Sequence, residues 1–283
     1  MSITATVLVL SAAIMHAVWN AYVKRAPDKV AMATLVYGAG LIVAIPGIFI
    51  FPLPTAEAWQ LIAIHSACHV VYKLALIAMY EEGDLSQVYP ATRGIAPLIT
   101  TLIAIPTIGE IPNGPQVVGI GLVCLGLLVF VFEPGVFTRK GAKPLLIAGV
   151  AGLMMSIYTI ADAVAMRDPT ARYPFVAWVF LFDALTMFAL AYWRRGARLG
   201  GLLAAQWKTG LACGVAAFVN FGIILWALSF AAVGNVAALR ETSVVFAALI
   251  GTLFMGEAFG RRRVFAAAVI TAGIIVMNWV VSA

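Results

Sequence analysis

One segment of this chain occurs twice, and the two copies are 147 residues apart. Each copy begins with an arginine, continues as an apolar stretch, ends at a Gly-Glu pair and is followed by a further glycine. An apolar chain of random sequence would not keep charged residues and glycines in step over this length, so we infer a tandem duplication. The pairs that keep the spacing are Arg93 and Arg240, Gly109 and Gly256, Glu110 and Glu257, and Gly126 and Gly273.

Composition places both copies in a membrane. Of the 283 residues, 63% are hydrophobic and 11% are charged, and the mean hydropathy is +1.03. Soluble domains carry about 25% charged residues because their surface faces water, so this surface faces lipid. The net charge of +6 comes from Lys and Arg in short loops between apolar runs. That distribution is typical of membrane proteins and argues against a nucleic-acid partner.

Charged residues, prolines and glycines divide the chain into ten apolar segments. A bilayer core needs about 20 residues per helix. Backbone polar groups in lipid must be satisfied within each segment, and no period-two pattern indicates a barrel, so we expect ten transmembrane helices. The expected spans are 3–24, 30–51, 58–80, 85–106, 114–132, 144–166, 173–193, 205–230, 234–255 and 262–281.

The ten spans form two halves of five. The link 133–143 separates a first repeat, residues 1–136, from a second, residues 143–283. Because five is an odd number, the second repeat enters the membrane from the opposite side, and the repeats are inverted. The expected fold class is therefore an all-α integral membrane protein with two inverted five-helix repeats. Such repeats are typical of transporters that hold the substrate between them near the bilayer midplane.

These features resemble a known family. Each half ends in an apolar helix, a Gly-Glu pair and a last helix containing glycine, and the stretches 16–20 and 88–94 fit bacterial members of about this length. Over its whole length the chain resembles the drug/metabolite transporter superfamily, EamA type. The resemblance implies a central cavity lined by spans 1, 3, 4, 6, 8 and 9, and export of small metabolites. The ten-helix aromatic amino-acid exporter of that superfamily is the nearest functional analogy.

Ionisable side chains inside the spans are costly and tend to face the bundle interior, so they are candidates for function. In span 3, His65, His69 and Lys73 recur every four residues and share one helical face. We expect this stripe to line an aqueous cavity and to be reachable from water; a role in helix packing is the alternative. The two histidines also have metal-ligand spacing, but no third ligand with a matching pattern is visible, and we expect no metal. The ionisable set is His16, His65, His69, Lys73, Arg93, Asp162, Asp183, Arg240 and Glu241.

Arg93 follows a predicted break in span 4. Pro90 removes a backbone donor and clashes with the preceding turn, so we expect a kink there, larger than any in span 9. Beside this kink the fork of Arg93 is suited to a carboxylate; pairing with an acidic residue such as Asp162 is the alternative. Arg240 is next to Glu241, but adjacent helix residues point about 100° apart, so we expect no simple pair between them.

Aromatic residues on the cavity-lining spans and two mid-membrane asparagines complete the expected site. No catalytic constellation or phosphate-binding loop is visible, so we expect neither an enzyme nor a cofactor. The expected substrate-binding residues are His16, Trp19, Asn20, His65, His69, Tyr72, Lys73, Tyr89, Arg93, Tyr158, Asp162, Asn220, Arg240 and Glu241.

Other conspicuous residues suit structural roles. Glu110 and Glu257 lie between spans and are expected to be exposed to water at helix ends. The three cysteines lie in apolar runs and are expected to be small buried hydrophobes. Glycines suited to close helix contacts are Gly38, Gly40, Gly119, Gly126 and Gly273.

The sequence therefore predicts a secondary transporter that exports small metabolites by alternating access. Amino acids, including aromatic or other hydrophobic ones, are the expected substrates, and the expected partners are this small molecule and the lipid bilayer, with a monomer sufficient for function. Efflux of drugs or cationic compounds is the alternative, although span 1 lacks the carboxylate on which small four-helix relatives depend. A membrane enzyme acting on lipid is a further alternative, without a visible catalytic site.

Charge also predicts orientation. The loops on one side carry 13 Lys or Arg, whereas the side that holds the termini carries only Arg167 and Arg172. The positive-inside rule places the first side in the cytoplasm and both termini in the periplasm, across the inner membrane. Ten-helix relatives are usually drawn with cytoplasmic termini, so charge and analogy disagree on this point.

Overall fold

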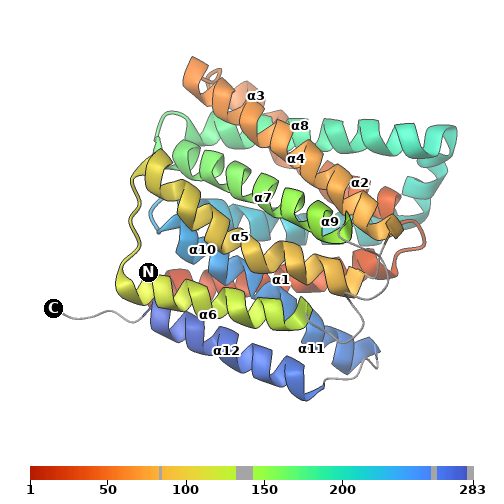
Figure 1. Ribbon diagram of the computed structural model, residues 1–283. Coiled ribbons are helices and arrows are strands. Elements are labelled where there is room, and N and C mark those ends of the chain that lie inside the picture. Colours follow the sequence, from red (N-terminus) through yellow and green to blue (C-terminus); the bar gives the residue numbers. More distant parts are fainter. Residues whose placement is uncertain (83–84, 132–142, 256–259, 279–283) are drawn as a thin grey trace.

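The helices follow the predicted spans closely. The computed structural model describes residues 1–82, 85–131, 143–255 and 260–278, and these form helices and connections without a β-strand (Figure 1). The first half contains α1 (Ile3–Arg25), α2 (Lys29–Gly38), α3 (Leu41–Ile50), α4 (Ala56–Glu82), α5 (Leu85–Ile108) and α6 (Gly114–Val131). The second half contains α7 (Lys143–Arg167), α8 (Arg172–Arg195), η1 (Gly196–Arg198), α9 (Leu199–Leu228), α10 (Val233–Glu241), α11 (Ser243–Met255) and α12 (Arg261–Met277).

The apolar helices make this a multi-pass membrane protein. Within the described residues, five stretches are long and apolar enough to cross a bilayer, and three shorter apolar helices accompany them. One long stretch contains both α8 and α9, so the count of ten crossings stays a prediction. The five stretches are Ile3–Arg25, Lys29–Ile50, Leu146–Arg167, Arg172–Leu228 and Val233–Ile250.

Ion pairs at the helix ends show that the two halves are inverted. Arg167, at the end of α7, pairs with Glu110 beyond the end of α5. Helix α8 starts after α7 and ends at the opposite face, where Arg195 Nε donates to Asp28 Oδ2 at 2.7 Å. Asp28 lies in the turn after α1, so α1 and its counterpart α7 end at opposite faces (Figure 1).

Helix contacts follow the same internal two-fold relation. Helix α4 packs on α7, and its counterpart α9 packs on α1. The last helices of the two halves, α6 and α12, pack on each other, and α5 contacts α10. Each half therefore contributes its first, third and fourth spans to the centre of the molecule.

Glycines allow α6 and α12 to approach closely. A Cβ atom on Gly119 would lie 2.4 Å from the Cβ of Met277, and one on Gly126 would lie 2.5 Å from a side-chain carbon of Ile270. A Cβ on Gly273 would lie 2.7 Å from a backbone oxygen of α6. No side chain fits at these distances, so the packing role predicted for these glycines is confirmed.

Two spans are interrupted, and one interruption corrects a prediction. Helices α2 and α3 are separated near Gly40, where a Cβ would lie 2.7 Å from the ring of Phe180. Helix α5 continues through Pro90, whereas its counterpart ends as α10 and resumes as α11 after Thr242. The predicted break at Pro90 was wrong, because α5 is continuous there and the interruption lies in span 9. Pro90 lies near the start of α5, where few helical hydrogen bonds precede it. At the break between α10 and α11, the Thr242 hydroxyl donates to the carbonyl of Leu239 at 2.6 Å and competes with the helical hydrogen bonds.

Polar residues set where several helices begin. The carboxylate of Asp28 accepts the backbone N–H of Ala31 at 2.9 Å and caps α2. Asn113 and Gln116 each accept the other's backbone N–H at 2.9 Å, which is a capping box at the start of α6. Partial burial opposes the charge of Asp28, but the N–H of Ala31 and the guanidinium of Arg195 outweigh it and lower the pKa of this carboxyl.

Glu110 is more than the water-exposed residue that was expected. Its carboxylate pairs with Arg167 and accepts the backbone N–H of Val233 at 2.8 Å. Arg167 also donates to the carbonyl of Leu228 at 3.2 Å. The Gly-Glu pair of the first half thus ties the end of α5 to the turn between α9 and α10. Glu257 lies outside the described residues.

The largest apolar cluster joins both halves and includes Val9 of α1, Leu127 of α6 and Leu228 of α9. Cys124 belongs to this cluster and Cys213 to a smaller one, and Cys68 is partly buried. The three cysteines are free thiols in apolar surroundings, as predicted.

Candidate functional site

A central cavity of about 140 Å³ lies between the two halves. An apolar cavity of roughly this volume accommodates a benzene-sized group, so the space suits a small molecule. Eight helices line it, four from each half, together with Gly40 in the turn after α2. The lining residues are His16, Trp19, Asn20, Val36, Tyr37, Gly40, His69, Tyr72, Arg93, Tyr158, Phe180, Asp183, Gly214, Ala217, Phe218, Asn220, Phe221, Ile224 and Arg240.

Helices α1, α2, α4 and α5 contribute from the first half, and α7, α8, α9 and α10 contribute from the second. The two repeats therefore supply the same number of helices to the cavity wall.

At one part of the wall, two arginines share a single buried carboxylate. Arg93 Nη1 donates to Glu241 Oε2 at 2.8 Å, and Arg240 Nε donates to Glu241 Oε1 at 3.0 Å. His16 Nε2 lies 3.1 Å from Arg93 Nη2 and accepts from it, since a guanidinium can only donate. We call His16, Arg93, Arg240 and Glu241 the arginine cluster. Among the described residues, its two guanidinium groups and one carboxylate leave one positive charge in excess.

This arrangement corrects two expectations. The acidic partner of Arg93 is Glu241 of α10 rather than Asp162. Arg240 and Glu241 do form a pair, although adjacent positions on a regular helix point apart. The pair forms because both side chains are long and the helix ends at Glu241, where the regular geometry stops.

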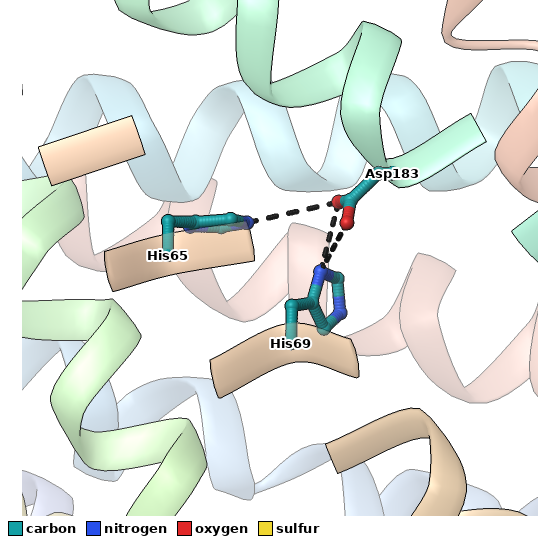
Figure 2. Close-up of side chains that lie close together, drawn as sticks. All are labelled: His65, His69 and Asp183. Carbon is teal, nitrogen blue, oxygen red and sulfur yellow. Dashed lines mark hydrogen bonds and ion pairs between the residues drawn. The ribbon is translucent and has the colours of Figure 1, made fainter. Parts of the chain in front are cut away.

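At and behind another part of the wall, two histidines and a lysine of α4 meet two aspartates of α7 and α8. His65 Nδ1 lies 2.6 Å from Asp162 Oδ1, and His69 Nδ1 lies 2.7 Å from Asp183 Oδ1. Lys73 Nζ donates to Asp183 Oδ1 at 2.8 Å. Figure 2 shows His65 and His69 directed at the same carboxylate of Asp183. We call these five residues the histidine cluster.

The stripe of α4 is one helical face, as predicted, but it is more buried than predicted. His65 is fully buried, and Lys73 is 3% exposed. Of the stripe only His69 lines the cavity, together with its partner Asp183. The stripe faces α7 and α8 rather than open water, because acidic residues on those helices pair with it.

The ligand atoms of His65, His69 and Asp183 lie within 4.8 Å of one another. Asp183 is therefore a third candidate metal ligand, which the sequence pattern did not reveal. The ammonium group of Lys73 lies 2.8 Å from the same carboxylate and would repel a divalent cation placed there. The residues are held together by ion pairs and hydrogen bonds with one another. That the protein binds no metal stays a prediction.

Aromatic rings cover much of the remaining wall. The ring centroids of Tyr158 and His69 are 5.1 Å apart, and those of Phe180 and Phe218 are also 5.1 Å apart. Trp19 packs edge-on against His16, with centroids 4.9 Å apart. The two charged clusters are therefore set in a mainly aromatic surface.

Most of the predicted site residues meet at this cavity. Those that line it are His16, Trp19, Asn20, His69, Tyr72, Arg93, Tyr158, Asn220 and Arg240. Four others, His65, Lys73, Asp162 and Glu241, lie buried behind the wall and bond to lining residues or to one another. The side chain of Tyr89 lies outside the described part of the chain.

Sequence reasoning left several lining residues out of the predicted site. Asp183 is an ionisable residue within a span, and that signal was sufficient to include it. Phe218 and Phe221 lie on the same helix as Asn220, which marked that stretch as polar. Tyr37 and Phe180 had no such signal, because aromatic residues are common throughout apolar spans.

Inverted helical halves around a partly polar cavity define a membrane transporter. A family model, the EamA-like transporter family, matches residues 3–132 and 142–279. The chain belongs to this family, and it is accordingly a membrane transporter of small solutes.

The fold is shared with a solved structure. A crystal structure described only as that of a protein has a TM-score of 0.73 and 17% sequence identity to this chain, and the match covers 97% of this chain and 98% of that one. At this identity the likeness concerns the fold alone. The comparison with curated proteins found no match.

Proposed function

We propose that this protein exports amino acids with apolar side chains, aromatic ones included. The observation that carries the proposal is the opposite charge balance of the two clusters in one cavity. The arginine cluster has a positive charge in excess. The histidine cluster has two carboxylates and one lysine, which leaves a negative charge in excess while both histidines are neutral.

A zwitterion complements these two clusters. Its carboxylate fits beside Arg93 and Arg240, whose planar forks suit carboxylate oxygens. Its ammonium group fits beside Asp183, the acidic residue that lines the cavity. The aromatic wall then contacts the apolar side chain, and a cavity of about 140 Å³ limits its size.

Alternating access follows from the inverted halves, which can rock about the central cavity. A second cavity shares Phe180 and Phe218 with the central one and extends to Arg172 and Ser229. These two rings therefore stand between the central site and one membrane face. We propose that the protein works as a monomer in the inner membrane. The loop charges favour an orientation with both termini outside. A reporter active only in the cytoplasm, fused after Ala283, is then expected to be silent.

Efflux of cationic compounds is the second candidate, and Asp183 favours it. A buried carboxylate in the cavity is the group that a cationic substrate requires, and here it comes from α8 rather than from span 1. The existing pairs of Asp183 with Lys73 and His69 argue against cation efflux, because a cationic substrate would compete with both residues.

Transport assays with matched ligands distinguish these candidates. Purified protein in liposomes is given radiolabelled phenylalanine, the amine phenethylamine, which lacks the carboxylate, and the acid 3-phenylpropionate, which lacks the ammonium group. We expect protein-dependent flux of phenylalanine and little flux of either analogue. Flux of the amine alone would support cation efflux, and flux of none of the three, with a wider amino-acid panel also inactive, would contradict the proposed substrate class.

A further inference from the structure

His65 lies between two buried carboxylates. Its Nδ1 is 2.6 Å from Asp162 Oδ1, and its Nε2 is 3.7 Å from Asp183 Oδ2. His65 and Asp162 are at most 1% exposed, and Asp183 is 5% exposed. Among the described residues, His65 Nε2 makes no hydrogen bond. A bare nitrogen lone pair facing a carboxylate in a buried site is unfavourable, and a proton between the two atoms removes that conflict.

The other members of the cluster need no further proton. Lys73 donates to the carboxylate and the backbone carbonyl of Asp183 and to the hydroxyl of Thr186. His69 Nδ1 lies against the Asp183 carboxylate, and His69 Nε2 lies 3.5 Å from the Tyr37 hydroxyl. A neutral ring with its proton on Nδ1 therefore satisfies both contacts. The histidine cluster then holds two negative charges and one positive charge.

Burying an uncompensated charge is costly, so the cluster favours one more positive charge. We propose that His65 binds a proton on Nε2 and that this proton is exchanged for the ammonium group of the substrate at Asp183. This inference rests on the proposed function, because it names how that transport is driven. Among the described residues, Tyr158, Tyr72 and Tyr37 also pack against these rings, and a phenol adds no charge to this balance.

The exchange follows from competition for one carboxylate. When His65 is protonated, the cluster is neutral and attracts an ammonium group weakly. When the proton leaves by way of Asp183, which lines the cavity, the negative charge returns and the substrate binds. Each ligand lowers the affinity for the other by the same factor. Proton entry on one side and substrate release on the same side then give proton-driven export.

The protonation state can be measured without any substrate. The chain has 3 histidines, so protein labelled with ¹⁵N-histidine gives a separate set of ring signals for each. His16→Gln and His69→Gln assign two sets, and the remaining set belongs to His65 even where a His65 variant does not fold. We expect His65 to carry protons on both ring nitrogens at neutral pH and His69 on one. A neutral His65 ring would overturn the proposal.

Coupling is then measured in liposomes that contain a pH-sensitive dye. Wild-type protein is expected to move protons in the direction opposite to the substrate. His65→Gln is expected to lose the proton movement that accompanies each substrate molecule. His69→Gln is the matched variant on the same stripe. An unchanged proton-to-substrate ratio in His65→Gln would overturn the coupling role. If wild-type protein transports no amino acid while His65 is doubly protonated, the proposed substrate is wrong and the proton site stands.

Discussion

The arginine cluster and the histidine cluster meet at the same cavity, but only the arginine cluster is built from equivalent positions of the two repeats. Arg93 and Arg240 are equivalent positions of the duplication, and they come together on one carboxylate at the centre of the molecule. The stripe of α4 has no such equivalent. At the corresponding spacing of 152, which aligns Ala75-Leu76 with Ala227-Leu228, the second half has Ala217, Phe221 and Leu225 in place of His65, His69 and Lys73.

The difference shows how a duplicated scaffold acquires polarity. Repetition alone would give a cavity with the same charge at both ends. Because only the first half carries the histidine stripe, one region of the wall has a positive charge in excess, and another has a negative charge in excess when His65 is neutral. A substrate with both charges can then be oriented.

The largest expected effect is the loss of the arginine cluster. Arg93→Ala removes one of two cations from a buried carboxylate that keeps Arg240 as a partner, so it should cost about 1.5–3 kcal/mol of stability, the range for a hydrogen bond to a charged group, as well as transport. The stability cost arises because the partner of Arg93 is the buried carboxylate of Glu241. Thermal unfolding in detergent and liposome flux measure the two effects separately.

The variant Arg93→Lys is the matched control. It keeps a cation beside Glu241 but lacks the planar guanidinium fork, so we expect it to recover most of the stability and little of the transport. Wild-type transport in Arg93→Lys would contradict a role for the guanidinium fork in holding the substrate carboxylate.

Asp183→Asn should change substrate preference. It removes the anionic end of the cavity, and the loss of a charged hydrogen bond of about 1.5–3 kcal/mol corresponds to roughly a 10- to 100-fold weaker interaction with an ammonium group. Phenylalanine flux should fall relative to flux of 3-phenylpropionate. Asp162→Asn, which is buried behind the wall, should leave the preference between these two ligands nearer to that of the wild type.

Accessibility of the α4 stripe gives a smaller and more local test. In a variant without Cys68, Cys124 and Cys213, a cysteine at position 69 should react with a soluble thiol reagent. Cysteines at positions 65 and 73 should react more slowly, because those side chains lie behind the cavity wall. Equal reaction rates at the three positions would mean that the stripe is open to water, as the sequence alone predicted.

The smallest effect is expected outside both clusters, at Asp28. Asp28→Asn keeps a capping side chain but loses the partly exposed ion pair with Arg195, so it should cost about 0.2–1 kcal/mol. The folded-state pKa of Asp28 is lowered, so its contribution is present above the unfolded pKa and is lost as the pH falls through the folded pKa. The stability of Asp28→Asn should therefore vary less than that of the wild type over this acidic range, as measured by thermal unfolding.

The sequence determined the helical membrane fold, the duplication and the helix contacts at glycine, because hydropathy, spacing and small residues are local properties that survive any arrangement of the helices. It also identified the histidine, aspartate and arginine residues that line the cavity, through the cost of ionisable groups in lipid. The tertiary structure decided which charges meet. Glu241 lies between two arginines, and Asp183 faces His65 and His69, because helices distant in sequence pack with particular rotations that no local pattern specifies. The charge balance of the cavity depends on those pairings, and it is therefore a property of the packed molecule.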